Sequence, residues 1–215
     1  MLKAILFDFD GTIIDSLKHH LKAWRKAFSQ NGIKLSDDEI VKKVFYQFGQ
    51  EDDLKYKIND KIHGLYLECI DEAIQEVEVH ENIKETLESL KKQGIKMAIV
   101  SFVDKEKILP ILNKFKMGKY FQQVLGHGDV KNRKPDPEIA QKAMDLLGVK
   151  PAETLLIGDT GLDIQTGKNA KTMTAFFNPE ANRLYTDMAL FRDVKPDIEF
   201  EHYQDLLPKL ERFIK

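Results

Sequence analysis

The sequence lacks the features that mark a disulfide-bonded, membrane-bound or nucleic-acid-binding protein. A single cysteine among 215 residues, Cys69, excludes an intrachain disulfide and is typical of a reducing compartment. The formal net charge is only −2, and lysines and arginines are spread along the chain, so no basic patch favours nucleic acid or an acidic membrane. No apolar run is long enough for a signal-peptide core or a membrane span. We therefore expect a cytoplasmic protein with neither nucleic-acid nor membrane partners.

The composition itself is that of an ordinary globular protein. Hydrophobic residues make up 42% of the chain and charged residues 32%. The length allows one large domain, or one domain that carries a smaller insert. Cys69 lies in a segment with a helical pattern, LYLECIDEAI, where we expect it to pack as a small hydrophobic residue.

The first 16 residues, MLKAILFDFDGTIIDS, contain the most informative pattern. The apolar run of residues 4–7 predicts a strand, and Asp8, Asp10 and Gly11 follow it directly. Residues i and i+2 of a strand point the same way, so the two carboxylates can share one site. Two close carboxylates suit a magnesium site, a nucleophile beside a general acid, or both. Aspartates at strand ends also serve as helix caps or turn formers, and this segment alone does not decide between these interpretations.

Residues 16–78 show helical periodicity without a convincing strand. An apolar face at helical spacing runs along residues 17–28 and includes Trp24, which we expect to be a core residue of the helix. Asn31 and Gly32 end this helix, and the pair Ser36 and Glu39 is a capping-box pattern that opens a short second one. Helical patterns resume near residue 51 and continue, with a break near residue 59, to about residue 76.

From residue 81 onward, helical and strand patterns alternate. We expect strands at 95–101, 121–126, 154–159, 171–177 and 197–200, separated by helices and followed by a C-terminal helix. Alternation of this kind predicts an α/β fold, a Rossmann-like parallel sheet with helices on both faces. The expected organisation is an α/β core of residues 1–14 and 81–215, with residues 15–80 inserted as a helical cap domain.

Several polar residues fall at the predicted carboxyl ends of strands, where ligands of such sheets bind. Asp8 and Asp10 follow the first strand, Ser101 ends the strand MAIVS, and Asp159 ends TLLIGD. The hydroxyl of Ser101 suits a phosphate oxygen or, equally, a helix cap. The insert leaves from the same edge, so it would stand over these residues.

Two further charged residues, Lys134 and Asp163, are candidates for the same site. Lys134 is in the loop NRKPDP, where the prolines can hold it toward a phosphate, although such a lysine is usually solvated. Asp163 follows Asp159 by four residues at the start of a helix. A carboxylate at this edge can complete an oxygen-ligand site for Mg²⁺.

In this order, DFDGT, Ser101, Lys134-Pro135 and GDTGLD resemble the four signature motifs of the haloacid dehalogenase-like hydrolase superfamily. The insert after the first motif resembles the C1 cap of the branch that contains phosphoglycolate phosphatases and β-phosphoglucomutases. The resemblance covers essentially the whole chain. The first and fourth motifs are specific, whereas Ser101 and Lys134 gain their meaning from this context.

The resemblance implies a two-step phosphoryl transfer. Asp8 would be the nucleophile that becomes an aspartyl-phosphate, and Asp10 would protonate the leaving oxygen and then activate water. The Asp8 carboxylate, the Asp10 backbone carbonyl and the Asp159 carboxylate would hold Mg²⁺. Ser101 and Lys134 would bind the phosphoryl oxygens.

The resemblance also implies supporting roles, and the sequence departs from the family pattern at two positions. Asp163 would support the metal waters and Lys134, and His20 matches a position where a histidine steadies the acid/base aspartate. Phe102 follows Ser101 where relatives often carry Asn, and Lys171 stands where Gly is usual.

The expected activity is Mg²⁺-dependent hydrolysis of a small phosphomonoester by a monomer or weak homodimer. Phosphoglycolate, a sugar phosphate and pyrophosphate all remain open as the substrate. Asp10 argues against a dehalogenase, which needs no acid there. A β-phosphoglucomutase-like mutase is the first alternative, although the segment GQEDDL contains no Arg for a second phosphate. A non-catalytic, receiver-like Mg²⁺-binding module is the alternative from another class.

The insert is expected to shield the substrate and to contain the specificity residues. We expect it to hinge on its two connections, at residues 15–17 and 79–82. The candidates for lining the substrate cavity are Phe45, Tyr46, Phe48, Gln50 and Lys55.

Overall fold

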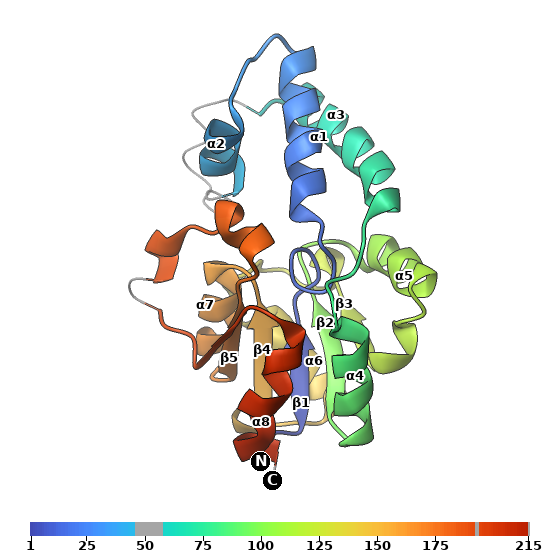
Figure 1. The fold of residues 1–215 in the computed structure, drawn as a ribbon, viewed down its shortest axis with the longest axis vertical. Helices are drawn as coiled ribbons and strands as arrows, with labels where there is room; N and C mark the ends of the chain where they lie inside the picture. The colour runs from blue at the N-terminus through green and yellow to red at the C-terminus, as the bar shows by residue number, and fades with distance from the viewer. Residues whose placement is uncertain (46–57, 192–193, 215) are drawn as a thin grey trace.

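A six-stranded parallel sheet forms the lower half of the molecule, with the helices of the insert above it (Figure 1). The computed structural model describes residues 1–45, 58–191 and 194–214. The strands are β1 (Ala4–Phe7), β2 (Lys96–Val100), β3 (Gln123–Leu125), β4 (Thr154–Gly158), β5 (Met173–Phe177) and β6 (Ile198–Phe200). Their order is β3-β2-β1-β4-β5-β6, so the direction of winding changes between β1 and β4. Ligands of such sheets bind at this switch point.

The register of the central strands brings their carboxyl ends level. Phe7, the last residue of β1, pairs with Ile99 of β2 and Ile157 of β4. The Asp8 amide continues the ladder and donates to the Ile157 oxygen over 2.8 Å. The predicted α/β fold with a parallel sheet is confirmed, and the residues that follow β1, β2 and β4 meet at one edge.

Helices cover both faces of this sheet because every central strand is apolar on both sides. The helices α4 (Ile83–Lys92), α5 (Lys105–Lys114) and α8 (Leu206–Ile214) pack on one face around a large apolar cluster. The helices α6 (Glu138–Leu147) and α7 (Gly161–Asn169) lie on the other face. The chain ends meet at the opposite edge from the insert, where the Leu2 amide donates to the Phe213 oxygen.

The insert has an apolar cluster of its own. Its helices are α1 (Leu17–Gln30), α2 (Asp37–Ile40), a π-helical turn (Val41–Phe45) and α3 (Asp60–Ala73). The rings of Trp24 and Tyr66 stack with centroids 3.9 Å apart and planes 11° from parallel. Trp24 and Cys69 are both buried in this cluster, which confirms that each is a packing residue.

Several element ends differ from the sequence prediction by one or two residues. The helix expected before the strand at 95–101 begins at Ile83 and not at residue 81, because Asn82 adopts a left-handed conformation with φ of 59°. Ser101 is not the cap of the next helix, since Asp104 is the residue that precedes α5. The predicted break near residue 59 is the start of α3, where the Asn59 side chain accepts from the Ile62 amide. The helical pattern of residues 51–57 lies outside the described residues.

None of the helices in the described ranges combines the length and the apolar character that crossing a bilayer requires.

Candidate active site

The predicted site residues come together at the carboxyl edge of β1, β2 and β4, under the insert (Figure 1). Asp8 follows β1, Ser101 follows β2 and Asp159 follows β4, each as the next residue after its strand. All three are buried, with exposed fractions of 7%, 3% and 2%. Polar groups at such depth need hydrogen-bond or charge partners, and these partners define the chemistry of the site.

The loop after β1 lies unusually close to Asp159. Gly11 has a φ of 69°, and a Cβ atom built there would lie 2.2 Å from Oδ2 of Asp159. A second contact of this kind joins Gly158 to Asp163, whose Cγ would be 2.3 Å from an added Cβ. Glycine at both positions is therefore required for the carboxylates to approach the backbone.

Lys134 is buried between two carboxylates. Its Nζ lies 2.7 Å from Oδ1 of Asp8 and 2.6 Å from Oδ1 of Asp163. The other oxygen of Asp163 accepts from the amide and hydroxyl of Thr160, in a capping box at the start of α7. Burial alone would lower the pKa of Lys134, but Asp163 and Asp8 outweigh it and hold this pKa above its usual range. The ammonium group therefore remains charged.

Burial dominates the electrostatics of Asp8 and Asp159. It raises the pKa of Asp8 to about 7, although the charge of Lys134 opposes this rise. Burial, followed by the charges of Asp8 and Asp163, raises the pKa of Asp159 well above its ordinary value. Oδ1 of Asp159 accepts from the Thr12 hydroxyl at 2.9 Å.

The carboxylates fit a divalent cation. Ligand oxygens of Asp8, Asp159 and Asp163 all lie within 4.8 Å of one another. Lys134 supplies one positive charge to these three acids, so the cluster has an excess of negative charge when ionised. Carboxylate oxygens at such spacing are the ligands that Mg²⁺ prefers. The side chain of Asp10 is not part of this cluster. The resemblance places Asp10 in the metal set through its backbone carbonyl and not through its carboxylate.

Asp10 instead faces the insert. Its Oδ1 lies 3.3 Å from Nε2 of His20 on α1, without hydrogen-bond geometry, and Nδ1 of His20 is 2.8 Å from the Tyr66 hydroxyl on α3. Burial would raise the pKa of Asp10, but His20, Ser16 and Lys134 together lower it below its ordinary value. The insert thus reaches the acid/base candidate through His20.

Ser101 occupies the same edge beside β1. Its Oγ accepts from the Val103 amide at 3.1 Å, and its own amide donates to the Leu125 oxygen. Phe102 places its ring 5.5 Å from Nζ of Lys134. An aromatic surface therefore borders the lysine.

Three functional candidates were not found from the sequence. Thr12 and Asn182 donate to Asp159, and Tyr66 holds His20. Thr12 belongs to the motif DFDGT, so the motif could have identified it as a site residue. Asn182 and Tyr66 belong to no motif, and their partners lie 23 and 46 residues away in the chain.

Only one of the proposed cavity residues of the insert can be placed. The ring of Phe45 contacts Tyr185 of the core, with centroids 5.1 Å apart. Tyr46, Phe48, Gln50 and Lys55 lie outside the described residues, as does the segment 49–54.

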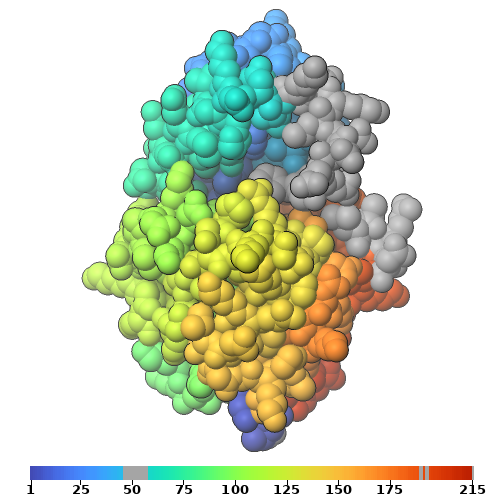
Figure 2. Space-filling view, turned by 180° about the vertical axis from the view of Figure 1, so that it is seen from behind, coloured from blue at the N-terminus to red at the C-terminus, as the bar shows by residue number. Residues whose placement is uncertain are grey.

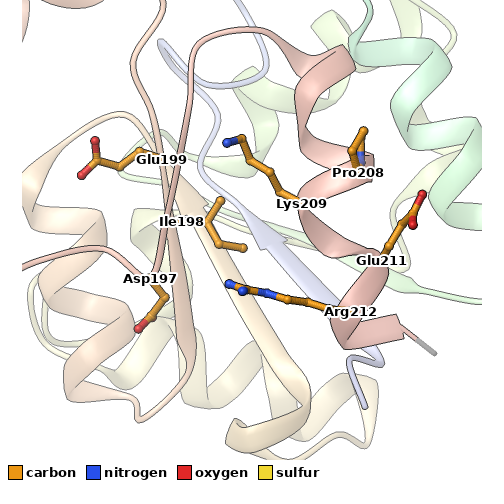
Figure 3. A pocket seen from close by; sticks show the side chains of 7 residues that line it. All are labelled: Asp197, Ile198, Glu199, Pro208, Lys209, Glu211 and Arg212. Atoms are coloured by element: carbon orange, nitrogen blue, oxygen red, sulfur yellow. The ribbon is translucent and has the colours of Figure 1, made fainter.

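Two hollows are visible on the surface. In the space-filling view the insert and the core are separated by a recess, in which atoms of the N-terminal segment can be seen (Figure 2). The hollow of about 580 Å³ in Figure 3 lies instead between β6 and α8, with Glu199, Lys209 and Arg212 among its lining residues. None of the predicted site residues lines it.

Comparison with known proteins identifies the family of the chain. Residues 5–177 match the family described as haloacid dehalogenase-like hydrolase. The chain is 30% identical to pyrophosphatase PpaX of Bacillus cereus (strain AH820), over 97% of this chain and 96% of that protein. It is 34% identical to phosphoglycolate phosphatase of Aquifex aeolicus, over 81% of this chain and 84% of the relative.

A solved structure shows the same fold. A hydrolase of the haloacid dehalogenase-like family from Streptococcus pneumoniae superposes with a TM-score of 0.80 at 18% identity. The alignment covers 98% of this chain and 99% of that one. The arrangement of sheet, insert and edge is therefore one that solved structures also contain.

Proposed function

The chain belongs to the haloacid dehalogenase-like hydrolase family, and from this premise we propose that it is a Mg²⁺-dependent phosphatase acting through an aspartyl-phosphate. The observation that carries the proposal is Lys134, buried between Asp8 and Asp163, two of the three clustered carboxylates. A fixed ammonium group next to a carboxylate nucleophile is suited to a phosphoryl group, whose negative charge it can neutralise.

In the first step, an oxygen of Asp8 attacks phosphorus and the bond to the substrate's leaving oxygen breaks. The leaving oxygen takes a proton from Asp10, so an alcohol, or phosphate where pyrophosphate is the substrate, departs and Asp8 holds the phosphoryl group. Lys134 holds Oδ1 of Asp8, which leaves the other oxygen, Oδ2, for the attack. Lys134 and Ser101 hold the phosphoryl oxygens during the transfer.

In the second step, water attacks the phosphorus of the aspartyl-phosphate and gives its proton to Asp10. The bond to Asp8 breaks, and phosphate and the original carboxylate are released. The contact with His20 favours the ionised form of Asp10, which this step needs. The first step needs the protonated form, which the negative charge of an incoming phosphate would favour.

Mg²⁺ would be held by the carboxylates of Asp8 and Asp159 and the backbone carbonyl of Asp10, with Asp163 in support. When bound, it would supply positive charge that favours the ionised carboxylates and neutralises the phosphoryl oxygens. The buried, negatively charged cluster supports this assignment.

The presence of a helical insert over the site favours a small substrate. We assign residues 15–80 to a cap domain and residues 1–14 and 81–215 to the core, because the insert has its own apolar cluster. The cap would hinge at residues 15–17 and 79–82 and exclude water when closed. We further propose a cytoplasmic monomer or weak homodimer without nucleic-acid or membrane partners, on the basis of the single cysteine and the unclustered charge.

Two substrates are favoured by the relatives. Phosphoglycolate is the first candidate because of the resemblance to the phosphatase of Aquifex aeolicus. Pyrophosphate is the second, because the chain matches pyrophosphatase PpaX over nearly its full length. The mutase alternative depends on residues 49–54, which the structure does not describe.

A substrate screen with matched variants tests the proposal. Purified protein should release phosphate from phosphoglycolate, pyrophosphate or a hexose phosphate with Mg²⁺, and should lose this activity with a chelator. Asp8→Asn should abolish turnover and leave the fold intact, because the amide is nearly isosteric but a poor nucleophile. Asp145→Asn, an exposed substitution on α6, is the control and should retain full activity. Activity of Asp8→Asn equal to that of the control would refute the covalent mechanism.

Two further variants separate the roles of the acids. Asp10→Asn should slow turnover by roughly 10²- to 10⁴-fold, the usual cost of losing a general acid/base. Asp159→Ala should instead raise the Mg²⁺ concentration needed for half-maximal activity, because one anionic ligand is removed. An unchanged metal requirement in Asp159→Ala would show that this carboxylate is not a ligand.

A further inference from the structure

Asn182 contacts both the loop after β1 and the carboxylate after β4. It belongs to the helical turn Glu180–Tyr185 after β5, and only 1% of it is exposed. Its Nδ2 donates to the backbone oxygen of Gly11 over 2.7 Å and to Oδ2 of Asp159 over 3.2 Å. One side-chain amide therefore joins the loop after β1 to the carboxylate after β4.

These two contacts fix the orientation of the amide group. A backbone carbonyl and a carboxylate oxygen are acceptors, so the NH₂ end of Asn182 must face them. The Oδ1 atom is buried and finds no hydrogen-bond partner within the described ranges. Because a buried, unpartnered acceptor costs free energy, its presence in a folded protein calls for an explanation beyond packing.

Asn182 also completes the set of donors around Asp159. The Thr12 hydroxyl donates to Oδ1 and Asn182 donates to Oδ2, so each carboxylate oxygen has a donor. Gly11 closes the remaining side, since an added Cβ would be 2.2 Å from Oδ2. Partners of this kind orient metal ligands, and their loss typically lowers metal affinity or activity roughly 10- to 100-fold.

We propose that Asn182 is a positioning residue for the metal site, which holds the Asp159 carboxylate in the orientation that binds Mg²⁺ and ties it to the loop after β1. The proposal rests on the proposed function, because it takes Asp159 to be a metal ligand. Asn182 belongs to none of the four signature motifs that the sequence resembles.

Metal binding in the absence of substrate is the direct test. Calorimetric titration of MgCl₂ into chelator-treated Asn182→Ala protein should give a Kd roughly 10-fold higher than that of the unaltered protein. At saturating Mg²⁺, kcat should return close to the unaltered value and the substrate KM should not change. A merely structural role would instead lower kcat at all Mg²⁺ concentrations.

Thr186→Val is the matched control. Thr186 directly follows the turn, and its hydroxyl donates to the backbone oxygen of Asn182 rather than to Asp159 or Gly11. This variant should bind Mg²⁺ as tightly as the unaltered protein. Equal weakening in both variants would overturn the proposal, since the turn and not the amide would then matter. Unaltered binding by Asn182→Ala would overturn it as well.

A measurement on the unaltered protein makes the test independent of how the variants fold. The side-chain amide NMR signals of Asn182 should shift when MgCl₂ is added, and those of the exposed Asn113 on α5 should not. An unshifted Asn182 signal in protein that binds Mg²⁺ would refute this inference alone. Protein that binds no Mg²⁺ at all would refute the proposed metal requirement together with it.

Discussion

Asp8, Asp10 and Asp159 are stabilised by three different kinds of partner. Asp8 has a buried ammonium, Asp10 has a histidine from the insert, and Asp159 has the neutral donors Thr12 and Asn182. Removing one member of a buried pair leaves an uncompensated charge, which costs more than the pair itself contributes. The stability of the core and its chemistry therefore depend on the same few atoms.

Lys134→Met should destabilise the metal-free protein by about 3–5 kcal/mol, because Asp8 and Asp163 lose their only nearby ammonium among the described residues. Urea denaturation in the presence of a chelator measures this change. The control is Lys168→Met, which removes an ion pair with the exposed Asp197 and should cost no more than about 1 kcal/mol. Equal losses in the two variants would show that burial of Lys134 contributes nothing.

Tyr66→Phe should lower kcat roughly fivefold, which corresponds to the net free energy of one hydrogen bond, about 1 kcal/mol. The phenylalanine ring keeps its stacking on Trp24 but no longer holds Nδ1 of His20. The substrate KM should not change. Tyr120→Phe, which alters a buried ring near the β3 edge, is the control and should leave kcat unchanged.

A second comparison tests whether Tyr66 acts through His20. In a His20→Asn background, the Tyr66→Phe substitution should have no further effect on kcat, because the side chain that it orients is already gone. Additive losses in the double variant would contradict this pathway.

At the scale of elements, the sequence predicted the sheet well because its signals are local. Strands such as TLLIG are apolar on both faces and are bounded by turns, which is sufficient to identify them. Element ends were less accurate, because they depend on single backbone conformations such as that of Asn82. Lys171 is another example, since its φ of 62° ends α7 and delays the next strand to Met173.

Lys171→Gly should raise the free energy of unfolding by about 0.5–1 kcal/mol. A left-handed conformation strains any residue with a Cβ atom, and glycine removes this strain. The Lys171 side chain is exposed, so little packing is lost. Thermal or urea denaturation measures the change, with Lys150→Gly as a control at an exposed residue of ordinary φ. Stabilisation by both substitutions, or by neither, would contradict the explanation.

At the scale of the whole molecule, the sequence predicted which motifs meet but not what holds them. The parallel sheet brings Asp8 and Asp159 together by topology alone. Asn182 reaches Gly11 across 171 residues, and no periodic pattern encodes such a contact. The resemblance implied that Asp163 supports Lys134, whereas the contact of Lys134 with Asp8 was not predicted, since it depends on the path of a loop.

The junction of insert and core should make stability depend on pH. His80 places Nε2 3.0 Å from the Gly11 oxygen and packs edge-on against Phe177, and burial lowers its pKa below the usual 6.5. The unfolded chain therefore binds a proton more readily than the folded one. Stability should be fully present above about pH 6.5 and decrease as the pH falls toward the lower pKa of the folded state.

His80→Gln provides the test, because glutamine retains a donor but does not titrate. The difference in unfolding free energy between pH 7.5 and pH 5.5 should be smaller in this variant than in the unaltered protein. An identical pH dependence would show that other groups are responsible.

The two chain crossings between insert and core lie side by side. The Asp15 amide donates to the Glu78 oxygen, the His80 amide donates to the Ile13 oxygen, and Ile14 pairs with Val79 in an antiparallel bridge. The ends of the insert are therefore held together by the core side of the junction, whatever lies between them. The separation of the two crossings is set by these contacts and not by the size or sequence of the helices between them. The core side of the junction is in this sense a fixed attachment point for an insert, and a replacement insert would have to supply its own partner for Asp10 in place of His20.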